Sequence, residues 1–352
     1  MLPLKRREFI TLLGGAAATW PLVARAQEPG RIYRVGGLHS SPRDAPHHLA
    51  LFDELRRLGF IDGQNLVVDA AGYGMSAERF AVHAAELVKA RVDVILAGGD
   101  AAVRAAQQAT TSIPILAFTD DMVGQGFVHS LGQPGGNTTG VTLLASELDG
   151  KRQEILIEAV PGVRRIAALA DSNTTTPSRL RALKEAARAR GVELSIHQVA
   201  RREEIGSAID AAKAGDAGAL NVLASSLLFN SRAFIFDRVA ALRLPTVYQW
   251  PEMAEQGGLI GYGPLIVQLY RDIMSRQLAK LLRGVKPADL PVEQPTRFEL
   301  VINLRAAHAI GHDVPAGLVL RADKVFAISS RCSAARRRHG RWRRERSSRQ
   351  RQ

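Results

Sequence analysis

Cysteine is almost absent from this chain of 352 residues. The single cysteine, Cys332, lies in an arginine-rich segment at the C-terminal end. A disulfide framework, a thiolate metal site and a cysteine nucleophile are therefore excluded from the rest of the chain. The sequence after the first 26 residues also has no run approaching the ~20 apolar residues of a membrane-spanning helix, so we expect none there.

Acidic residues are outnumbered by basic ones, but only at the two ends. The formal net charge is +13, of which residues 1–26 carry +3 and residues 327–352 carry +9, leaving +1 for the residues between them. A nearly neutral body lacks the electrostatic footprint of a nucleic-acid-binding protein, and we expect no such partner. Residues 327–352 are predicted to be a disordered basic tail, because arginine and serine bury too little apolar surface to fold. A shifted reading frame and an anion-binding function are the two explanations of it.

The motifs of several enzyme classes are missing. The sequence has neither the phosphate-binding pattern G-x-x-x-x-G-K-[ST] nor the nucleophile elbow G-x-S-x-G. His308 and His312 are four residues apart, but the glutamate of the H-E-x-x-H zinc motif is absent between them. Asp120 and Asp121 are either half of an acid–base pair or the cap of a helix, and we favour the cap. We therefore expect no metal, no cofactor and no catalysis.

The first residues, "MLPLKRREFITLLGGAAATWPLVARAQ", have the three parts of a cleaved export signal. A charged start precedes a mildly apolar stretch, and Ala24-Arg25-Ala26 ends it in the small-x-small pattern that a signal peptidase cuts. Arg6-Arg7-Glu8-Phe9-Ile10 resembles the twin-arginine export signature, although Lys5 stands where Ser or Thr is usual. We expect residues 1–26 to be removed and the protein to be periplasmic, by the twin-arginine or the general route.

The remaining pattern alternates between strands and helices in two successive series. Such β-α repeats predict an α/β fold made of two similar lobes, each a doubly wound parallel sheet covered by helices, with a cleft between them. The first series has predicted strands at 32–38, 65–70, 92–97, 113–118 and 139–143, with helices at 46–58 and 77–90. The second has predicted strands at 164–170, 192–198, 218–223, 244–248 and 298–304, with helices at 147–160, 176–190, 202–214, 230–243 and 265–283.

Small and polar residues follow the carboxyl ends of these strands, where open parallel sheets bind their ligands. Ser, Thr, Asp and Asn at such places are also good helix caps, but their recurrence over both series favours a shared cleft. Gly98 and Gly99 would let a ligand approach the backbone, and the N–H groups of the helix that follows could hold a carboxylate. Trp250 offers a flat ring for stacking. The predicted ligand-binding residues are His39, Ser40, Gly98, Gly99, Asp100, Thr119, Asp120, Asp171, Ser172, Asn173, Ser225, Ser226, Tyr248, Gln249, Trp250 and Tyr262.

Several longer strings resemble one family. The twin-arginine leader, "AELVKARVDVILAGG", "IPILAFTDDMVGQGFVHSLGQPGGNTTGVT", "ELDGKRQEILIEAVPGVRRIAALAD", "LPTVYQWPEMAEQGGLIGYGP" and "KPADLPVEQPTRFELVINLRAAHAIG" are similar to those of ABC-importer substrate-binding proteins, among them binders of tryptophan and other aromatic amino acids. The resemblance runs from about residue 5 to 325. The family's third strand tip commonly reads Thr/Ser-Asp-Pro-Val, whereas residues 119–123 here are one residue longer and lack the proline.

The resemblance implies a type I periplasmic binding protein, with three crossovers between lobes that clamp a ligand and a monomer that meets an ABC permease. It implies one lobe of 30–143 plus 263–288, another of 144–262 plus 289–326, and a hinge strand at 261–264. The expected ligand is small and carboxylate-bearing, an amino acid or an aromatic acid. Asp100 and Asp120 are candidates either to hold an amine or to cap the helices that they begin. The alternatives are a sensor for a membrane receptor, a cleft enzyme, and a repressor, which would need a DNA-binding headpiece where the export signal stands.

Overall fold

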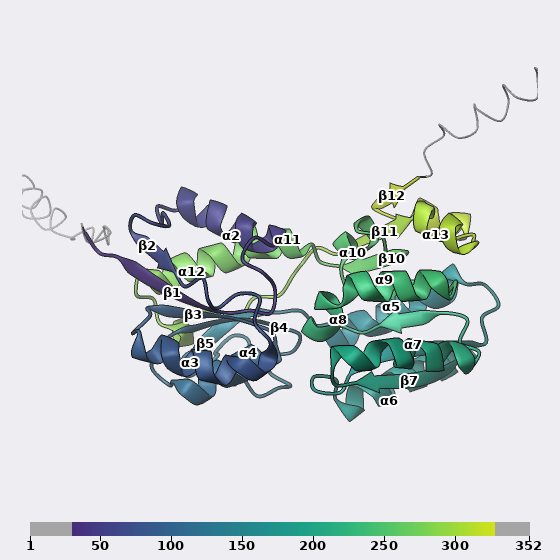
Figure 1. The fold of residues 1–352 in the computed structure, drawn as a ribbon, viewed down its shortest axis with the longest axis horizontal. Coiled ribbons are helices and arrows are strands. Elements are labelled where there is room, and N and C mark those ends of the chain that lie inside the picture. Colours follow the sequence, from purple (N-terminus) through teal and green to yellow (C-terminus); the bar gives the residue numbers. More distant parts are fainter. Residues whose placement is uncertain (1–29, 328–352) are drawn as a thin grey trace, which may run out of the picture.

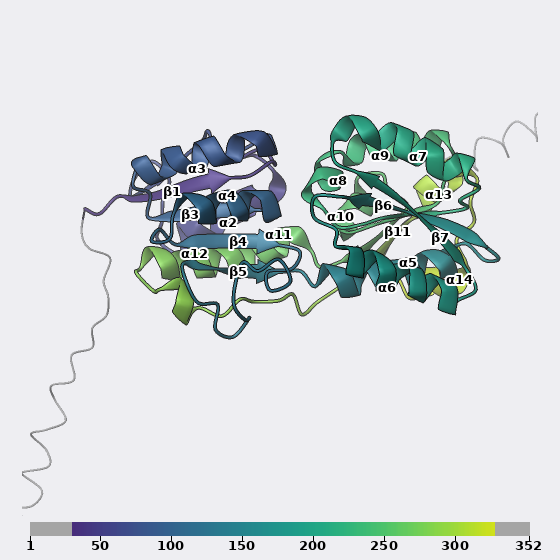
Figure 2. The same ribbon diagram turned by 90° about the horizontal axis from the view of Figure 1, so that it is seen from below.

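The structure is a computed structural model, and it describes residues 30–327 apart from the side chains of residues 145 and 146 (Figures 1 and 2). The predicted export signal and basic tail lie outside the described residues. Two helix-covered sheets stand side by side, and the predicted α/β fold class is confirmed. No helix in this described part is long and apolar enough to cross a bilayer.

The five-stranded lobe is built on a parallel sheet of order β2-β1-β3-β4-β5. Helices cover both faces, α2 and α12 on one and α3 and α4 on the other (Figure 1). The strands are therefore buried on both sides, which explains apolar runs such as "VILAG" in β3. Its elements are β1 (Tyr33–Leu38), α2 (Pro46–Arg57), β2 (Leu66–Val68), η1 (Ala77–Arg79), α3 (Phe80–Lys89), β3 (Val94–Gly98), α4 (Asp100–Ala109), β4 (Ile115–Thr119) and β5 (Thr138–Thr142), followed much later by α11 (Ile266–Gln268), the π-helical turn η3 (Leu269–Met274), α12 (Ser275–Leu282) and η4 (Pro287–Asp289).

The seven-stranded lobe is built on a sheet of order β12-β11-β10-β9-β8-β6-β7. Only the β10–β11 pair is antiparallel. Helices α7 and α9 cover one face, and α5 and α6 cover the other (Figure 2). Its elements are α5 (Ala145–Ala159), β6 (Arg165–Asp171), α6 (Pro177–Ala189), β7 (Glu193–Val199), η2 (Arg202–Glu204), α7 (Ile205–Ala214), β8 (Leu220–Val222), α8 (Ser226–Asn230), α9 (Arg232–Ala241), β9 (Thr246–Tyr248), α10 (Pro251–Glu255), β10 (Ile260–Gly263), β11 (Glu299–Asn303), α13 (Leu304–Ile310), α14 (Ala316–Leu320) and β12 (Lys324–Phe326).

The chain passes between the two lobes three times: after β5, after β10 and after η4. Two expected boundaries differ from what the structure shows. Residues 261–263 are not a separate hinge strand but the end of β10, inside the seven-stranded sheet. Residues 290–293 still belong to the five-stranded lobe, because Thr139 Oγ1 donates to the Leu290 carbonyl at 2.6 Å and Glu293 bridges to Val141 on β5.

One predicted helix is confirmed and another is interrupted. The helix expected at 230–243 is α9, and the short helix α8 precedes it, with the Ser225 hydroxyl capping the start of α8 by accepting from the Leu228 N–H at 3.1 Å. The helix expected at 265–283 contains the π-helical turn η3, in which the Ser275 hydroxyl donates to the Arg271 carbonyl. Such turns are frequent at functional sites, and Tyr270 in η3 lines the cavity described next.

Candidate ligand-binding site

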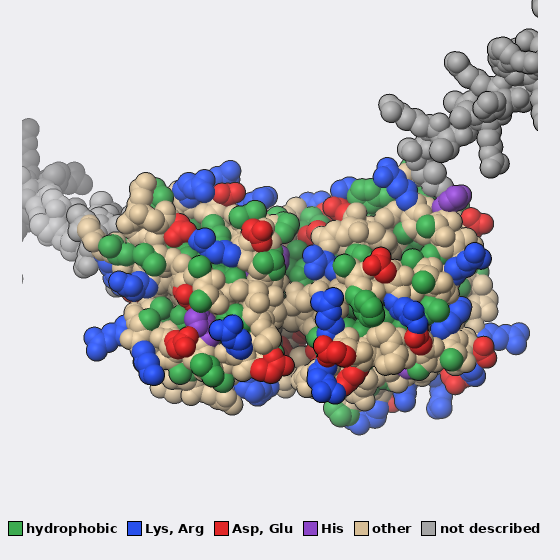
Figure 3. Space-filling view, in the orientation of Figure 1, with side chains coloured by type: hydrophobic (Ala, Val, Ile, Leu, Met, Phe, Trp, Pro, Cys, Tyr) green, Lys and Arg blue, Asp and Glu red, His purple; other side chains and the backbone are tan. Residues whose placement is uncertain are grey.

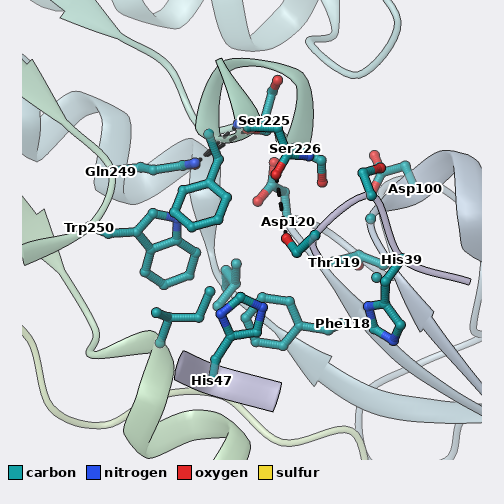
Figure 4. A pocket seen from close by; sticks show the side chains of 18 of the residues that line it. His39, His47, Asp100, Phe118, Thr119, Asp120, Ser225, Ser226, Gln249 and Trp250 are labelled. Carbon is teal, nitrogen blue, oxygen red and sulfur yellow. Dashed lines mark hydrogen bonds between the residues drawn. The ribbon is translucent and has the colours of Figure 1, made fainter. Parts of the chain in front are cut away.

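A cavity lies where the carboxyl ends of strands from both sheets face each other (Figure 4). It holds about 610 Å³ of empty space, the part open to solvent included. The predicted site residues on its wall are His39, Ser40, Gly98, Gly99, Asp100, Thr119, Asp120, Ser225, Ser226, Gln249 and Trp250.

Three predicted residues at the end of β6 lie behind the wall instead of on it. The Asp171 carboxylate accepts from the Ser225 hydroxyl at 3.0 Å and from the Asn173 N–H at 2.9 Å. Ser172 donates to the Val199 carbonyl, and Asn173 donates to the Ala200 carbonyl, so both tie β6 to β7. These residues hold the turn that supports Ser225.

The two predicted tyrosines point away from the cavity. Tyr248 and Gln249 are consecutive in an extended segment, so their side chains leave on opposite sides. Gln249 lines the cavity, and the Tyr248 ring packs edge-on against Phe236 at 5.0 Å. Tyr262 lies on β10, and its ring stacks on Phe298 at 6.4 Å.

The sequence pattern did not identify another group of wall residues. Phe118 is the penultimate residue of β4, and its apolar surroundings in the sequence indicate a core residue. His47, Phe229 and Tyr270 lie on helices and not in the segments that directly follow the strands. A signal for His47 exists, because it precedes the buried Leu51 by four residues and shares its face of α2. The additional wall residues are Ser41, His47, Phe118, Leu143, Thr174, Phe229, Asn230, Ile266 and Tyr270.

Aromatic rings gather at one end of the cavity (Figure 4). The Phe118 ring stacks on Trp250 at 6.2 Å and meets Tyr270 at 4.9 Å. His47 meets Tyr270 edge-on at 4.7 Å, and Phe229 meets Trp250 edge-on at 6.4 Å. Such a wall suits an aromatic or bulky apolar group.

The acidic residues of the wall follow neighbouring strands. Asp100 comes after β3 and Asp120 after β4, and these strands pair side by side. Burial, and next the charge of Asp120, raises the pKa of Asp100 to about 7. Burial raises the pKa of Asp120 to about 6, against the opposing charge of Arg179. Both carboxyl groups are therefore poorly solvated, and neither forms an ion pair on the wall.

The histidines of the wall are neutral. Burial lowers the pKa of His39 well below its ordinary value and that of His47 to about 3. Behind them, the pKa of His48 is lowered to about 4 by burial, and its Nδ1 lies 2.8 Å from the Pro42 carbonyl. His39 and His47 therefore offer hydrogen-bonding nitrogens and ring faces, not positive charge.

The start of α4 exposes backbone donors to this space. Its N-cap residue, Gly99, has φ 91° and no side chain to cap the first turn. Close packing surrounds the two glycines: a Cβ on Gly98 would lie 2.4 Å from His39 Nδ1, and one on Gly99 would lie 2.5 Å from Ser226 Oγ. The N-terminus of a helix attracts anionic groups.

A buried ion-pair cluster supports the wall from the seven-stranded lobe. The Arg152 guanidinium donates to Asp149 at 2.8 Å, to the Gln249 carbonyl at 2.9 Å and to the Tyr262 carbonyl at 2.8 Å. Arg179 donates from Nε to the same Asp149 at 2.8 Å. The cluster joins α5 and α6 to the ends of β9 and β10, next to the cavity.

A family model described as "ABC transporter substrate binding protein" matches residues 47–326. The chain belongs to this family. Members of the ABC transporter substrate-binding family bind small molecules and work with ABC permeases. In the part of the chain that the structure describes, no cluster of three or more His, Cys, Asp or Glu residues could hold a metal ion.

Three similar proteins illustrate the family and its fold. A tyrosine-binding protein of Clostridioides difficile is 25% identical over 248 residues, which cover 70% of each chain. A conserved domain protein of Vibrio cholerae has a similar structure, with a TM-score of 0.76, 23% identity and coverage of 84% of this chain and all of that one. A Streptococcus pneumoniae ABC domain in complex with L-tryptophan has a TM-score of 0.71 and 22% identity, with 83% of this chain and 99% of that chain covered.

Proposed function

We propose that the protein is the periplasmic solute-binding component of an ABC importer and clamps an amino acid with an apolar or aromatic side chain. The proposal rests on one observation: aromatic rings, carboxylates and hydrogen-bond donors line the same cavity. Phe118, Trp250 and Tyr270 would hold the side chain, and Asp100 and Asp120 would hold the ammonium group. The carboxylate would meet the first turn of α4 and the hydroxyl of Ser226.

The similar proteins support the same ligand class. One is named for binding tyrosine, and another was crystallised with L-tryptophan. The cavity of this chain offers aromatic rings and carboxylates together, which an amino acid of that class needs. Nothing in the wall supplies a nucleophile held by a base, and we propose binding without turnover by a monomer that docks on a permease.

Contacts between the lobes support a clamp that opens to admit the ligand. The Ser41 hydroxyl donates to Asn230 at 3.4 Å, and the Gln125 amide donates to the Thr174 carbonyl at 3.3 Å, each across the cleft. These contacts are few and long, so a ligand that bridges both lobes would shift the balance between open and closed forms. The permease would then distinguish the two forms.

A thermal-shift screen of the proteinogenic amino acids tests the ligand class. We expect an aromatic or large aliphatic amino acid to raise the melting temperature, because binding to the folded state alone stabilises it. Small and acidic amino acids are the matched negatives. A panel in which no amino acid shifts the melting temperature would contradict the proposed ligand class.

Export is tested separately, since the leader lies outside the described residues. Mass spectrometry of periplasmic material should show a mature N-terminus near Gln27. Replacing Arg6 and Arg7 by lysine should block export if the twin-arginine route is used. An intact Met1 in exported protein would contradict the cleaved signal.

A further inference from the structure

The charged groups of the cavity wall are all acidic. Among the described residues that line it, Asp100 and Asp120 are the only ones that can carry charge near neutral pH, since His39 and His47 are neutral and the wall has no lysine or arginine. Asp100 is 8% exposed. No hydrogen bond or ion pair joins either carboxylate to another described side chain. A ligand therefore meets two carboxylates that have no directly bonded counter-ion.

The nearest cations are already held by other partners. Arg179 and Arg152 face Asp120 from the seven-stranded lobe, but both bind Asp149. Arg104 on α4 is exposed, donates to Gln125 and lies over the Phe127 ring at 5.1 Å.

The neighbouring acids have partners as well. Asp121 accepts from the Gly124 N–H at 2.8 Å, and Asp171 accepts from Ser225. These groups complete the charged surroundings of the pair formed by Asp100 and Asp120. Asp149 balances only one of the two guanidinium groups, so Arg152 and Arg179 keep one net positive charge that faces Asp120 and offsets part of the charge of this pair.

Three further polar atoms on the wall lack partners, and one of them is Thr174 Oγ1. Thr119 Oγ1 and His39 Nε2 are buried without a hydrogen-bond partner among the described residues. Thr119 is 2% exposed and His39 is 3% exposed, and both line the cavity beside the two carboxyl groups. Buried polar groups are normally paired, so these atoms mark a place where a polar ligand group completes the wall. Neutral hydroxyl and imidazole groups can both accept from an ammonium group.

We propose that the ammonium group is the part of the ligand that this cavity requires, and that aromatic primary amines without a carboxylate bind at the same site. This inference rests on the proposed function and narrows its ligand class. An ammonium group between Asp100 and Asp120 offsets the negative charge that remains on this pair, whereas a carboxylate there would add to it. The carboxylate has only the first turn of α4 and the Ser226 hydroxyl to hold it. Aromatic acids without an amine are consequently excluded as ligands of this cavity.

Ligands that share one aromatic ring and differ in their ammonium or carboxylate group separate the contributions of these two groups to binding. Isothermal titration of the full chain would compare phenylalanine, 2-phenylethylamine and 3-phenylpropionate, and then the corresponding tyrosine and tryptophan series. Within the series that binds, we expect the amine to be within ~10-fold of the amino acid and the propionate to be at least ~10-fold weaker than the amine. Asp100→Asn and Asp120→Asn should each weaken amine binding at least ~10-fold. Asp121→Asn is the matched control, because Asp121 is absent from the wall.

The outcomes distinguish this inference from the function on which it rests. If an amino acid binds and its amine does not, or if the propionate binds as well as the amino acid, the inference is wrong and the amino-acid clamp stands. If no member of any series binds, the proposed function fails and the inference fails with it. Thermal melting of each variant shows whether a loss of binding reflects unfolding.

Discussion

Gly99 and Ser226 touch across the cleft so closely that a Cβ on residue 99 would lie 2.5 Å from the serine Oγ. Gly99 precedes α4 in the five-stranded lobe, and Ser226 begins α8 in the seven-stranded lobe. A side chain at residue 99 would have to push the Ser226 hydroxyl aside, so the close approach of the lobes favours glycine here. Its φ of 91° adds a second reason for glycine.

Gly99→Ala should therefore hinder closure. We expect ligand affinity to fall at least ~10-fold, because the new methyl group holds the lobes apart or shifts α4. Gly63→Ala is the control, since Gly63 has φ 80° with no atom near its would-be Cβ. Both variants should lose about 1 kcal/mol of stability from backbone strain, and only the first should lose affinity. Equal affinity of Gly99→Ala and wild type, measured by calorimetry, would show that the contact does not limit closure.

Trp250 should report ligand binding by fluorescence. It is the only tryptophan in residues 30–327, it is 4% exposed, and its ring faces Phe118 and Phe229 on the wall. Ligand binding should change the emission of the wild type and leave that of Trp250→Phe unchanged. Trp250→Ala should weaken binding by about 0.5–1.5 kcal/mol beyond the effect of lost area. Unchanged affinity in Trp250→Ala would contradict the stacking role.

Asp100 should make binding and stability depend on pH in opposite ways. Its pKa is raised to about 7 in the fold, so its contribution to the stability of the unliganded protein is present below the ordinary value and is lost as the pH rises through about 7. Asp100→Asn should stabilise the unliganded protein at about pH 8, by about 1–3 kcal/mol, and reduce the pH dependence of melting.

Ligand affinity should change in the other direction. Acidification from about pH 8 to about pH 5 should weaken the binding of an amine or an amino acid. Asp100 and Asp120, whose pKa values are raised to about 7 and about 6, take up protons in this range and lose their negative charge. Calorimetry at several pH values and denaturant melts measure both effects. Affinity that does not fall on acidification would contradict the role of these carboxylates.

Arg152 should be essential for stability. Its buried guanidinium binds Asp149 and also donates to two carbonyls next to the cavity, so Arg152→Gln should cost about 1–3 kcal/mol for each carbonyl left without a donor, while Asp149 keeps Arg179. Arg165→Gln is the matched control, since Arg165 pairs with Glu193 at the surface and should cost no more than about 1 kcal/mol. Urea melts compare the two. A small effect of Arg152→Gln would mean that the cluster is replaceable.

The surface charge of the described part does not indicate a nucleic-acid-binding protein. Figure 3 shows acidic and basic side chains interspersed over this face of both lobes. That distribution agrees with the small net charge expected from the sequence for the residues between the leader and the tail. The basic character of the whole chain comes from its two ends.

Strands and their polar ends were predictable from local patterns, because β3 and β4 are apolar runs that stop at Gly98 and Thr119. Those patterns located Asp100, Asp120 and Ser225 on the cavity wall. They could not locate Tyr270, which enters the cavity from a π-helical turn after the second crossover. Long-range packing also decided which face of β9 Tyr248 occupies.

The buried ion-pair cluster could not be predicted from the sequence either. Asp149, Arg152 and Arg179 read as ordinary charged helix residues, and only the packing of α5 against α6 buries them together. Local sequence patterns describe which residues share a face, not what a distant element places opposite them.

Isothermal titration of the full chain with aromatic amino acids, beside the Asp120→Asn variant, is the most direct test of the proposed amino-acid clamp. We expect one ligand per chain, saturable heat for at least one of phenylalanine, tyrosine and tryptophan, and affinity at least ~10-fold weaker in the variant. Absence of saturable binding by all three, or equal affinity in wild type and variant, would contradict it.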